Sequence, residues 1–248
     1  MKIKVFNNLA AALTCLVPAL LLSAQSGFAG DFASRAILGF SADGSRFAFE
    51  EYGRQDGSGF PYASIYIIDT ASDQWTGGSP FRVLVEDEAS SISDARQKAR
   101  SNAAAQLAAI TEPGTINATN QPLELPADSK RMAARAYPFT PPTTDSIEFR
   151  LMTRPFPGDE FCMEFGGPAG FTLLEIATAP GKSTRILHAD ETIPQSRSCP
   201  LDYHFADIVT YRPDGAGDLV AAILILMERR GFEGPDGRYL AVTTHLAP

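Results

Sequence analysis

The chain has 248 residues, of which 44% are hydrophobic and 10% aromatic, so it is long and apolar enough to form a folded core. Its 29 acidic residues outnumber its 21 Lys and Arg residues and give a net charge of −8. This acidic balance argues against a nucleic acid or an anionic membrane surface as the partner, because both attract Lys and Arg.

The first thirty residues have the layout of a cleavable secretory signal. Lys2 and Lys4 form a short basic start, and an uncharged apolar run extends from Leu9 to Leu22. That run is shorter than the roughly 20 apolar residues that span a bilayer. The small residues at positions 27 and 29 suit cleavage after position 29. We therefore expect a periplasmic or secreted protein with a signal peptide at 1–29 and a single β-rich domain at 30–248, with no membrane span after cleavage.

Short strands are predicted along most of the mature chain. Arg35–Phe40 and Arg46–Tyr52 are rich in apolar and aromatic residues, and the Asp43-Gly44 pair between them is typical of a tight hairpin turn. Further strands are expected at 64–69, 81–85, 146–153, 160–165, 171–178, 184–188, 206–211, 219–227 and 238–244.

One amphipathic helix is predicted at about 91–110. Ser91 is a suitable N-cap, and Asp94 stands three residues later, which is the spacing of a capping box. Ala95, Ala99 and Ala103 recur at helical spacing, and such a narrow alanine-rich stripe favours close packing on a sheet. The Pro-, Thr- and Ala-rich segment at 112–142 is expected to be a connector.

Cys162 and Cys199 are the two cysteines that remain when the signal is removed together with Cys15. Two cysteines of a secreted domain usually pair in an oxidising compartment, so we expect a disulfide between them. The alternative is a reactive thiol. It needs a nearby base for activation, and neither cysteine lies in the signature of a known cysteine enzyme.

Two histidines lie close to carboxylates, in the pairs His188 with Asp190 and His204 with Asp207. Mixed histidine and carboxylate ligands suit zinc or a similar ion, so these four residues are the candidate metal ligands. Their spacing matches no known metal-binding pattern, and hydrogen-bonded histidines at strand ends are the alternative. We expect no cofactor, because the common nucleotide-binding, metalloprotease and serine-hydrolase motifs are absent from the sequence.

A segment near the C-terminus combines charge, aromatic residues and glycine. Its three arginines, Arg229, Arg230 and Arg238, can bind a carboxylate or a phosphate in bidentate fashion. Phe232 and Tyr239 lie among them, so these five residues are the candidate binding residues. A charged hairpin turn without a ligand is the alternative interpretation.

The first predicted hairpin resembles one blade of the TolB-type propeller repeat. The resemblance rests on Phe40-Ser-Ala-Asp43-Gly44, on Ala48-Phe49 and on an apolar strand that ends at Asp69, although Ala42 replaces the proline of the repeat. It implies a mainly β, propeller-like arrangement. A β-sandwich built of long hairpins is the alternative, because an Asp-Gly turn between strands occurs in many folds.

The signal, this opening hairpin and the closing Gly-Phe-Glu-Gly-Pro-Asp-Gly-Arg-Tyr at 231–239 together resemble a bacterial family of predicted secreted proteins of unknown function. The resemblance extends over 31–244 and implies no catalytic residues. We therefore expect a non-enzymatic binding or interaction module of the bacterial cell envelope, with an envelope protein or a small ligand as its partner. The alternative is a periplasmic hydrolase or metal-dependent enzyme that uses the four candidate metal ligands.

Overall fold

The computed structural model describes residues 30–121, 128–135, 146–164, 166–213 and 218–246, so the expected signal peptide lies outside the described residues. Antiparallel strands dominate these residues, which confirms the expectation of a mainly β fold. The strands form three sheets, and the described helices are α1 (Ile92–Leu107), the short α2 (Glu160–Met163) and the 3-10 turn η1 (Gln195–Arg197).

The first sheet, here the helix-side sheet, has the order β4-β3-β2-β1-β6, and β5 also pairs with β3. Its strands are β1 (Ser34–Ser41), β2 (Arg46–Arg54), β3 (Pro61–Asp69), β4 (Gln74–Trp75), β5 (Phe81–Leu84) and β6 (Ile110–Glu112). The central sheet has the order β14-β13-β12-β7. Its strands are β7 (Thr115–Thr119), β12 (Pro200–Tyr211), β13 (Leu219–Arg230) and β14 (Pro235–Leu246).

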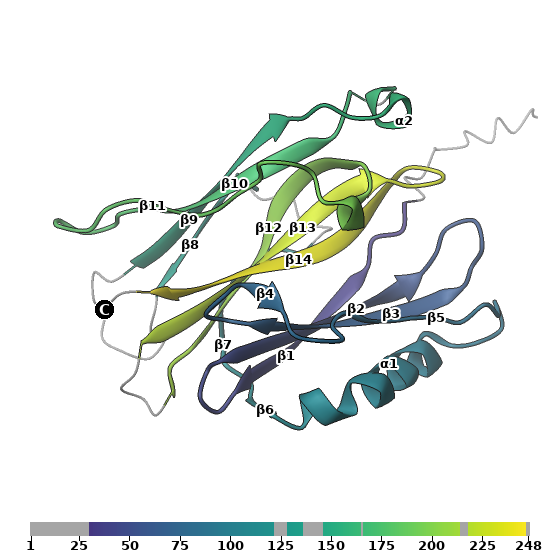
Figure 1. The fold of residues 1–248 in the computed structure, drawn as a ribbon, viewed down its shortest axis with the longest axis horizontal. Coiled ribbons are helices and arrows are strands. Elements are labelled where there is room, and N and C mark those ends of the chain that lie inside the picture. The colour runs from purple at the N-terminus through teal and green to yellow at the C-terminus, as the bar shows by residue number, and fades with distance from the viewer. Residues whose placement is uncertain (1–29, 122–127, 136–145, 165, 214–217, 247–248) are drawn as a thin grey trace, which may run out of the picture.

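The third sheet, here the disulfide-side sheet, has the order β11-β10-β9-β8. Its strands are β8 (Arg131–Arg135), β9 (Ser146–Pro155), β10 (Ala169–Glu175) and β11 (Arg185–Ala189). Helix α1 and the three sheets stack in layers, and the central sheet lies between the other two (Figure 1). Three clusters of buried apolar residues fill the spaces between these layers. The fold is therefore a stack of three antiparallel sheets with α1 packed on the outer face of the helix-side sheet.

Strand β13 explains why the central sheet takes the middle position. Nine consecutive residues, Leu219–Met227, are buried, and a strand with such a continuous apolar run is covered on both faces. Successive side chains of a strand point to opposite faces. Accordingly, Ile223 and Ile225 pack in the cluster next to the disulfide-side sheet, whereas Leu224 packs in the cluster next to the helix-side sheet.

Helix α1 begins at the predicted cap. The backbone N–H of Asp94 donates to Ser91 Oγ at 3.1 Å, and the backbone N–H of Ser91 donates to Asp94 Oδ2 at 2.9 Å, which completes the capping box. Ala95, Ala99 and Ala103 are buried against apolar residues of β2 and β3, as the alanine stripe indicated. Small side chains on this face let the helix approach the sheet closely.

Ser91→Ala is expected to lower the free energy of unfolding by about 0.5–2 kcal/mol, because it leaves an amide of the first turn without its partner. Urea denaturation monitored by circular dichroism measures this loss. Ser93→Ala is the matched control, since Ser93 is exposed in the same turn and makes no capping bond. Equal stability of the Ser91 and Ser93 variants would show that the cap is not a stabilising feature.

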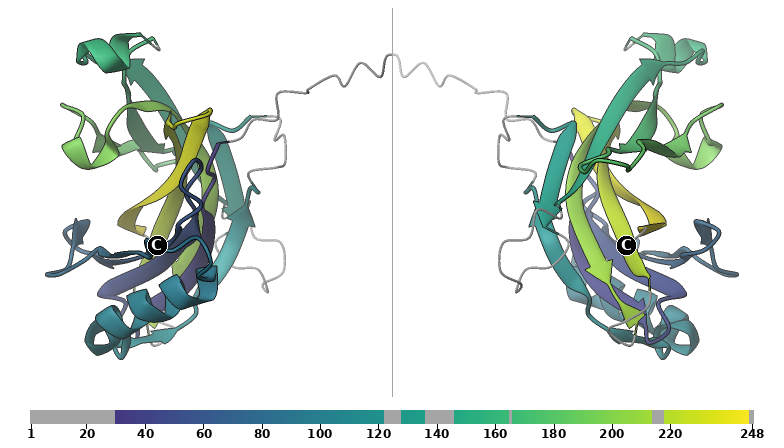
Figure 2. Two further views of the ribbon diagram at one scale, coloured as in Figure 1. Left: turned by 90° about the vertical axis from the view of Figure 1, so that its right-hand side faces the viewer. Right: turned by 90° about the vertical axis from the view of Figure 1, so that its left-hand side faces the viewer.

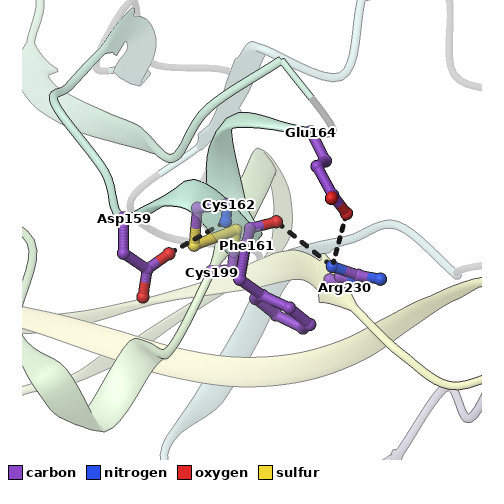
Figure 3. The surroundings of a disulfide bond; sticks show 6 residues. All are labelled: Asp159, Phe161, Cys162, Glu164, Cys199 and Arg230. Atoms are coloured by element: carbon purple, nitrogen blue, oxygen red, sulfur yellow. Dashed lines mark hydrogen bonds and ion pairs between the residues drawn. A yellow bond between two sulfur atoms is a disulfide. The ribbon is translucent and has the colours of Figure 1, made fainter.

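The structure confirms the disulfide between Cys162 and Cys199, whose Cα atoms lie 5.6 Å apart. Cys162 lies in α2, where its backbone N–H donates to the N-cap side chain of Asp159 at 2.9 Å. Cys199 directly precedes β12, so the bond fastens α2 to the central sheet (Figure 3). Arg230 adds a second link, since its guanidinium lies 3.7 Å from the centroid of the Phe161 ring.

Replacing both cysteines by alanine is expected to lower the free energy of unfolding by about 3–4 kcal/mol, because the bond closes a loop of 37 residues and so restricts the unfolded chain. The measurement compares the urea unfolding of the oxidised protein with that of the double variant. The intact mass of the oxidised protein should also be two hydrogens lower than after reduction. Unchanged stability together with an unchanged mass would contradict the disulfide.

Two expectations about local structure were wrong or incomplete. The segment 160–165 was expected to be a strand, but Asp159 caps a single helical turn there, α2. A turn this short shows no periodicity that distinguishes it from a strand. The expected connector at 112–142 also contains β7 and β8, which are edge strands of the central and disulfide-side sheets.

Candidate functional site

The three sheets border one cleft at their common side. Strand β14 forms an edge of the central sheet, and β11 forms an edge of the disulfide-side sheet on the same side of the molecule as β4 and β5 (Figure 2). The cleft has a volume of about 1120 Å³, and residues of all three sheets line it. Such a volume is large enough for a small organic ligand.

The helix-side wall of the cleft follows from the alternation of side chains along β2, β3 and β5. On β3, Ala63 and Ile65 face α1, so that their neighbours Tyr62, Ser64 and Tyr66 face the cleft. The cross-strand partners on β5 continue this face, because Arg82 pairs with Ser64 and Leu84 pairs with Tyr62. The other lining residues of this wall include Phe49, Glu51, Asp73 and Trp75.

The remaining walls come from the other two sheets. The disulfide-side sheet and the η1 turn contribute Phe171, His188 and Arg197. The central sheet contributes the ends of two strands, with Met227 and Arg229 on β13 and Arg238 to Val242 on β14. The cleft therefore combines arginines with aromatic and aliphatic side chains.

Glu51 is a buried carboxyl group on the floor of the cleft. Its Oε1 accepts a hydrogen bond from the Tyr66 hydroxyl at 2.8 Å, and its Oε2 accepts one from the backbone N–H of Tyr239 at 2.9 Å. Burial raises the pKa of Glu51, although these bonds and the positive charges of Arg238 and Arg229 oppose the rise. Glu51 thus connects the helix-side sheet to the edge of β14.

Arg238 has a carboxylate partner behind the cleft surface. Its Nη2 lies 2.5 Å from Asp31 Oδ2, and its guanidinium lies 4.7 Å from the centroid of the Tyr62 ring. The Tyr62 hydroxyl also donates to Asp31, at 2.8 Å. Burial raises the pKa of Asp31, although the charge of Arg238 opposes the rise. Arg229 lies 3.5 Å from Asp236. These ion pairs hold both arginines in the wall of the cleft.

Asp190 holds the opposite wall in place. It accepts hydrogen bonds from Arg197 at 2.7 Å and from the backbone N–H of Phe171 at 2.8 Å, and the His188 ring nitrogen Nε2 lies 2.9 Å from its Oδ1. Burial disfavours the charged form, but the hydrogen bonds and the charge of Arg197 outweigh it, so that the pKa of Asp190 is lowered.

A family model described as "Predicted secreted protein (DUF2259)" matches residues 48–245. The chain belongs to this family. The match confirms the resemblance found in the sequence, and the family is one of secreted proteins without an assigned function. Neither the curated proteins nor the solved structures gave a match to the chain. Among the described helices of this secreted protein, none has the length and hydropathy needed to cross a membrane.

The structure brings together three of the five candidate binding residues of this secreted protein. Arg229, Arg238 and Tyr239 line the cleft. Arg230 points instead to α2, where it donates to the backbone carbonyl of Phe161 at 3.1 Å (Figure 3). Phe232 is 80% exposed and lies outside the cleft. The binding role of the three cleft residues stays a prediction.

The four candidate metal ligands do not converge, which corrects the metal-site hypothesis. His188 and Asp190 contact each other, but His204 lies near Glu228 at 3.2 Å, and Asp207 accepts from Arg35 at 2.9 Å. Among the described residues, no group of three or more His, Cys, Asp and Glu side chains is placed to hold a metal ion. The geometry therefore gives no support to a hydrolase or metal-dependent enzyme built on these four residues.

Sequence reasoning missed Arg82 and Trp75. Trp75 is 47% exposed at the cleft, and the Arg82 guanidinium lies 5.7 Å from the centroid of its ring. The predicted strand at 81–85 showed that Arg82 alternates with apolar neighbours. It did not show which face of that strand would meet the cleft, because the partner sheets are distant in the sequence.

The stability contributed by Glu51 is expected to depend on pH with a definite sign. Its folded pKa is raised above its ordinary value of 4.5, so this contribution is fully present below pH 4.5 and is lost as the pH rises through the folded pKa. Relative to a Glu51→Gln variant, the protein should therefore lose stability as the pH rises above 4.5. Each unit by which the folded pKa exceeds the unfolded one corresponds to about 1.4 kcal/mol.

Urea denaturation of both proteins at several pH values measures this difference. Glu148→Gln is the control, because hydrogen bonds from Arg131 and Arg150 lower the pKa of Glu148 to about 2. The protein should gain stability relative to that variant as the pH rises from 2 to 4.5, which is the opposite direction. A difference between the native protein and Glu51→Gln that stays constant with pH would contradict the assignment.

Proposed function

We propose that this secreted protein is a non-enzymatic binding protein of the bacterial cell envelope and that its ligand occupies the cleft between the three sheets. The observation that carries the proposal is the meeting of three sheets around a space of about 1120 Å³. Pockets that bind organic molecules combine mostly apolar walls with a few fixed polar groups. The walls here contain aromatic and aliphatic side chains and polar groups in similar measure, and three of the arginines are held by ion pairs.

The construction of the walls supports a binding role. Most of the lining residues lie on strands, whose backbone positions are set by the sheet ladders. The polar side chains are also held, since Arg238, Arg197 and Glu51 each have hydrogen-bonded partners behind the surface. A preorganised site of this kind loses less conformational entropy on binding than a flexible one.

Two matched variants test the proposal. Gly77 lies in the cleft wall, and a Cβ atom placed there would meet no atom within 4 Å, so Gly77→Phe introduces a ring at the cleft wall without a clash at its Cβ atom. Ala105→Phe places the same side chain on the exposed face of α1, away from the cleft. Fractions of an envelope extract from producing cells are then tested for their effect on the melting temperature.

A fraction that contains the ligand at about 100 times its dissociation constant stabilises the folded state by about 2.7 kcal/mol. For a domain of this size that free energy raises the melting temperature by several degrees. We expect this increase for the native protein and for Ala105→Phe, and its loss for Gly77→Phe. The proposal is wrong if no fraction raises the melting temperature, or if the two variants respond equally.

A further inference from the structure

The arginines of the cleft differ in how their charges are compensated. Arg238 pairs with Asp31, Arg229 with Asp236, and Arg197 with Asp190. The side chains of these three aspartates are at most 10% exposed, so they lie behind the arginines and leave the guanidinium groups at the cleft surface. These three arginines therefore have charge partners before any ligand arrives.

Arg82 has no such carboxylate partner among the described residues. Its side chain is exposed at the cleft, and in the part of the chain that the structure describes no carboxylate oxygen lies within 4.0 Å of its guanidinium. Its neighbours are the Trp75 ring and the Tyr66 hydroxyl. An arginine presents five N–H donors in a fixed plane, which suits the two oxygens of a carboxylate or phosphate. Among the described residues, Arg82 is thus the arginine of the cleft that has no carboxylate partner.

The carboxylates of the cleft, in contrast, already accept hydrogen bonds from donors of the protein. Glu51 accepts from Tyr66 and from the backbone of Tyr239. Asp73 accepts from the backbone N–H of Thr243 at 2.7 Å and from its hydroxyl at 2.9 Å. A cation at Glu51 would meet two oxygens that each already accept a hydrogen bond, whereas an anion would meet the donors of Arg82 without displacing a carboxylate.

Apolar surface lies on both sides of Arg82. Trp75 is 47% exposed and Leu84 is 43% exposed, although both residues belong to types that proteins usually bury. Leu84 stands two residues after Arg82 on β5 and therefore shares its face of the strand. Exposed apolar side chains grouped at a cleft indicate contact with an apolar part of a ligand.

We infer that the ligand of this cleft is an organic anion, in which a carboxylate or phosphate group binds Arg82 and an apolar body packs on Trp75 and Leu84. The inference rests on the proposed function and specifies its ligand class. The chain as a whole carries a net charge of −8. Attraction of an anion to Arg82 would therefore be a local property of the cleft, because the overall charge of the protein repels anions.

The chain itself supplies the reporter for a test. Trp75 is its only tryptophan, so the intrinsic tryptophan fluorescence of the protein reports on the cleft alone. Four probes are titrated: cyclohexylacetate, cyclohexyl phosphate, the uncharged cyclohexylacetamide and the cationic cyclohexylmethylammonium. These probes share the cyclohexyl ring and do not absorb where tryptophan emits. We expect at least one anion to bind about tenfold more tightly than the amide and the ammonium probe to bind no better than the amide.

Ionic strength and a charge variant separate the role of Arg82 from unspecific attraction. Salt at 0.5 M should reduce the preference for the anion, because exposed charges are screened. Arg82→Gln should lower the affinity for the anion to that for the amide and leave the amide unchanged. Lys98→Gln removes the same charge from the exposed face of α1 and should have no effect. Calorimetry repeats each titration independently of fluorescence.

The inference is overturned if neither anion binds up to 1 mM, if the amide or the ammonium probe binds as tightly as the anions, or if Arg82→Gln retains the preference. Cyclohexylacetate and cyclohexyl phosphate distinguish carboxylate from phosphate as the preferred group. The test also separates this inference from the proposed function. If an envelope fraction protects the native protein but not Gly77→Phe, and its active component is neutral or cationic, the cleft binds a ligand and only the anion inference fails.

Discussion

Ile223→Ala and Leu224→Ala are each expected to lower the free energy of unfolding by about 2–5 kcal/mol, although these neighbours on β13 point in opposite directions. Both side chains are fully buried. Ile223 packs toward the disulfide-side sheet and Leu224 toward the helix-side sheet. Truncation of either one removes apolar contacts and leaves a cavity in a different core. A large loss at both positions is the energetic signature of a sheet that is covered on both faces.

Urea denaturation of the two variants measures these losses. Ile186→Ala is the control, because Ile186 is an aliphatic residue of β11 that is 67% exposed, and its truncation should cost less than about 0.5 kcal/mol. If one member of the pair behaves like this control, β13 is covered on one face only, and the layered architecture is wrong.

Asp207→Ala is expected to be the second large effect, with a loss of about 3–5 kcal/mol. Asp207 on β12 pairs with Arg35 on β1, and their side chains are only 5% and 9% exposed. Without Asp207, the Arg35 guanidinium keeps neutral partners, the Tyr239 hydroxyl at 3.0 Å and the backbone carbonyl of Asn120 at 2.9 Å. A buried positive charge would then have no counter-charge, which is the costly state.

Two further variants test this explanation. Arg35→Met combined with Asp207→Leu removes both charges and should recover most of the loss, because a buried ion pair itself contributes little net stability. Asp202→Ala breaks the ion pair between Asp202 and Lys130, whose side chains are 37% and 30% exposed, respectively. This change should lower the free energy of unfolding by about 1 kcal/mol or less. If the double variant is as unstable as Asp207→Ala, the loss does not come from the unpaired charge.

Local signals were sufficient to predict most of the elements. The Asp43-Gly44 pair predicted the first hairpin, the capping box at Ser91 predicted the start of α1, and the apolar run that begins at Leu219 predicted β13. Each signal depends on residues that are close in the sequence. The elements that were missed have weak local signals: α2 is one turn long, and β7 and β8 are short edge strands within a Pro-, Thr- and Ala-rich segment.

The candidate site was predictable only in part, for a physical reason. Arg229, Arg238 and Tyr239 lie together on one hairpin, so their clustering was visible in the sequence. Arg82 and Trp75 reach the same cleft from the helix-side sheet through contacts between distant segments. The metal-site hypothesis failed for the same reason, because closeness in sequence does not determine which sheet a residue joins. His188 and His204 are near in sequence, but they lie on strands of different sheets.

The central claim of this account is that the cleft of the secreted protein holds a ligand, and mass spectrometry tests it most directly. The mature protein is recovered from its own cells without denaturation and measured first under native and then under denaturing conditions. Under native conditions, we predict an added small-molecule mass on the unsubstituted protein and on Ala105→Phe, but not on Gly77→Phe. Under denaturing conditions, this added mass should be lost from both proteins that carried it. Native and denatured masses that agree for all three proteins would contradict the claim.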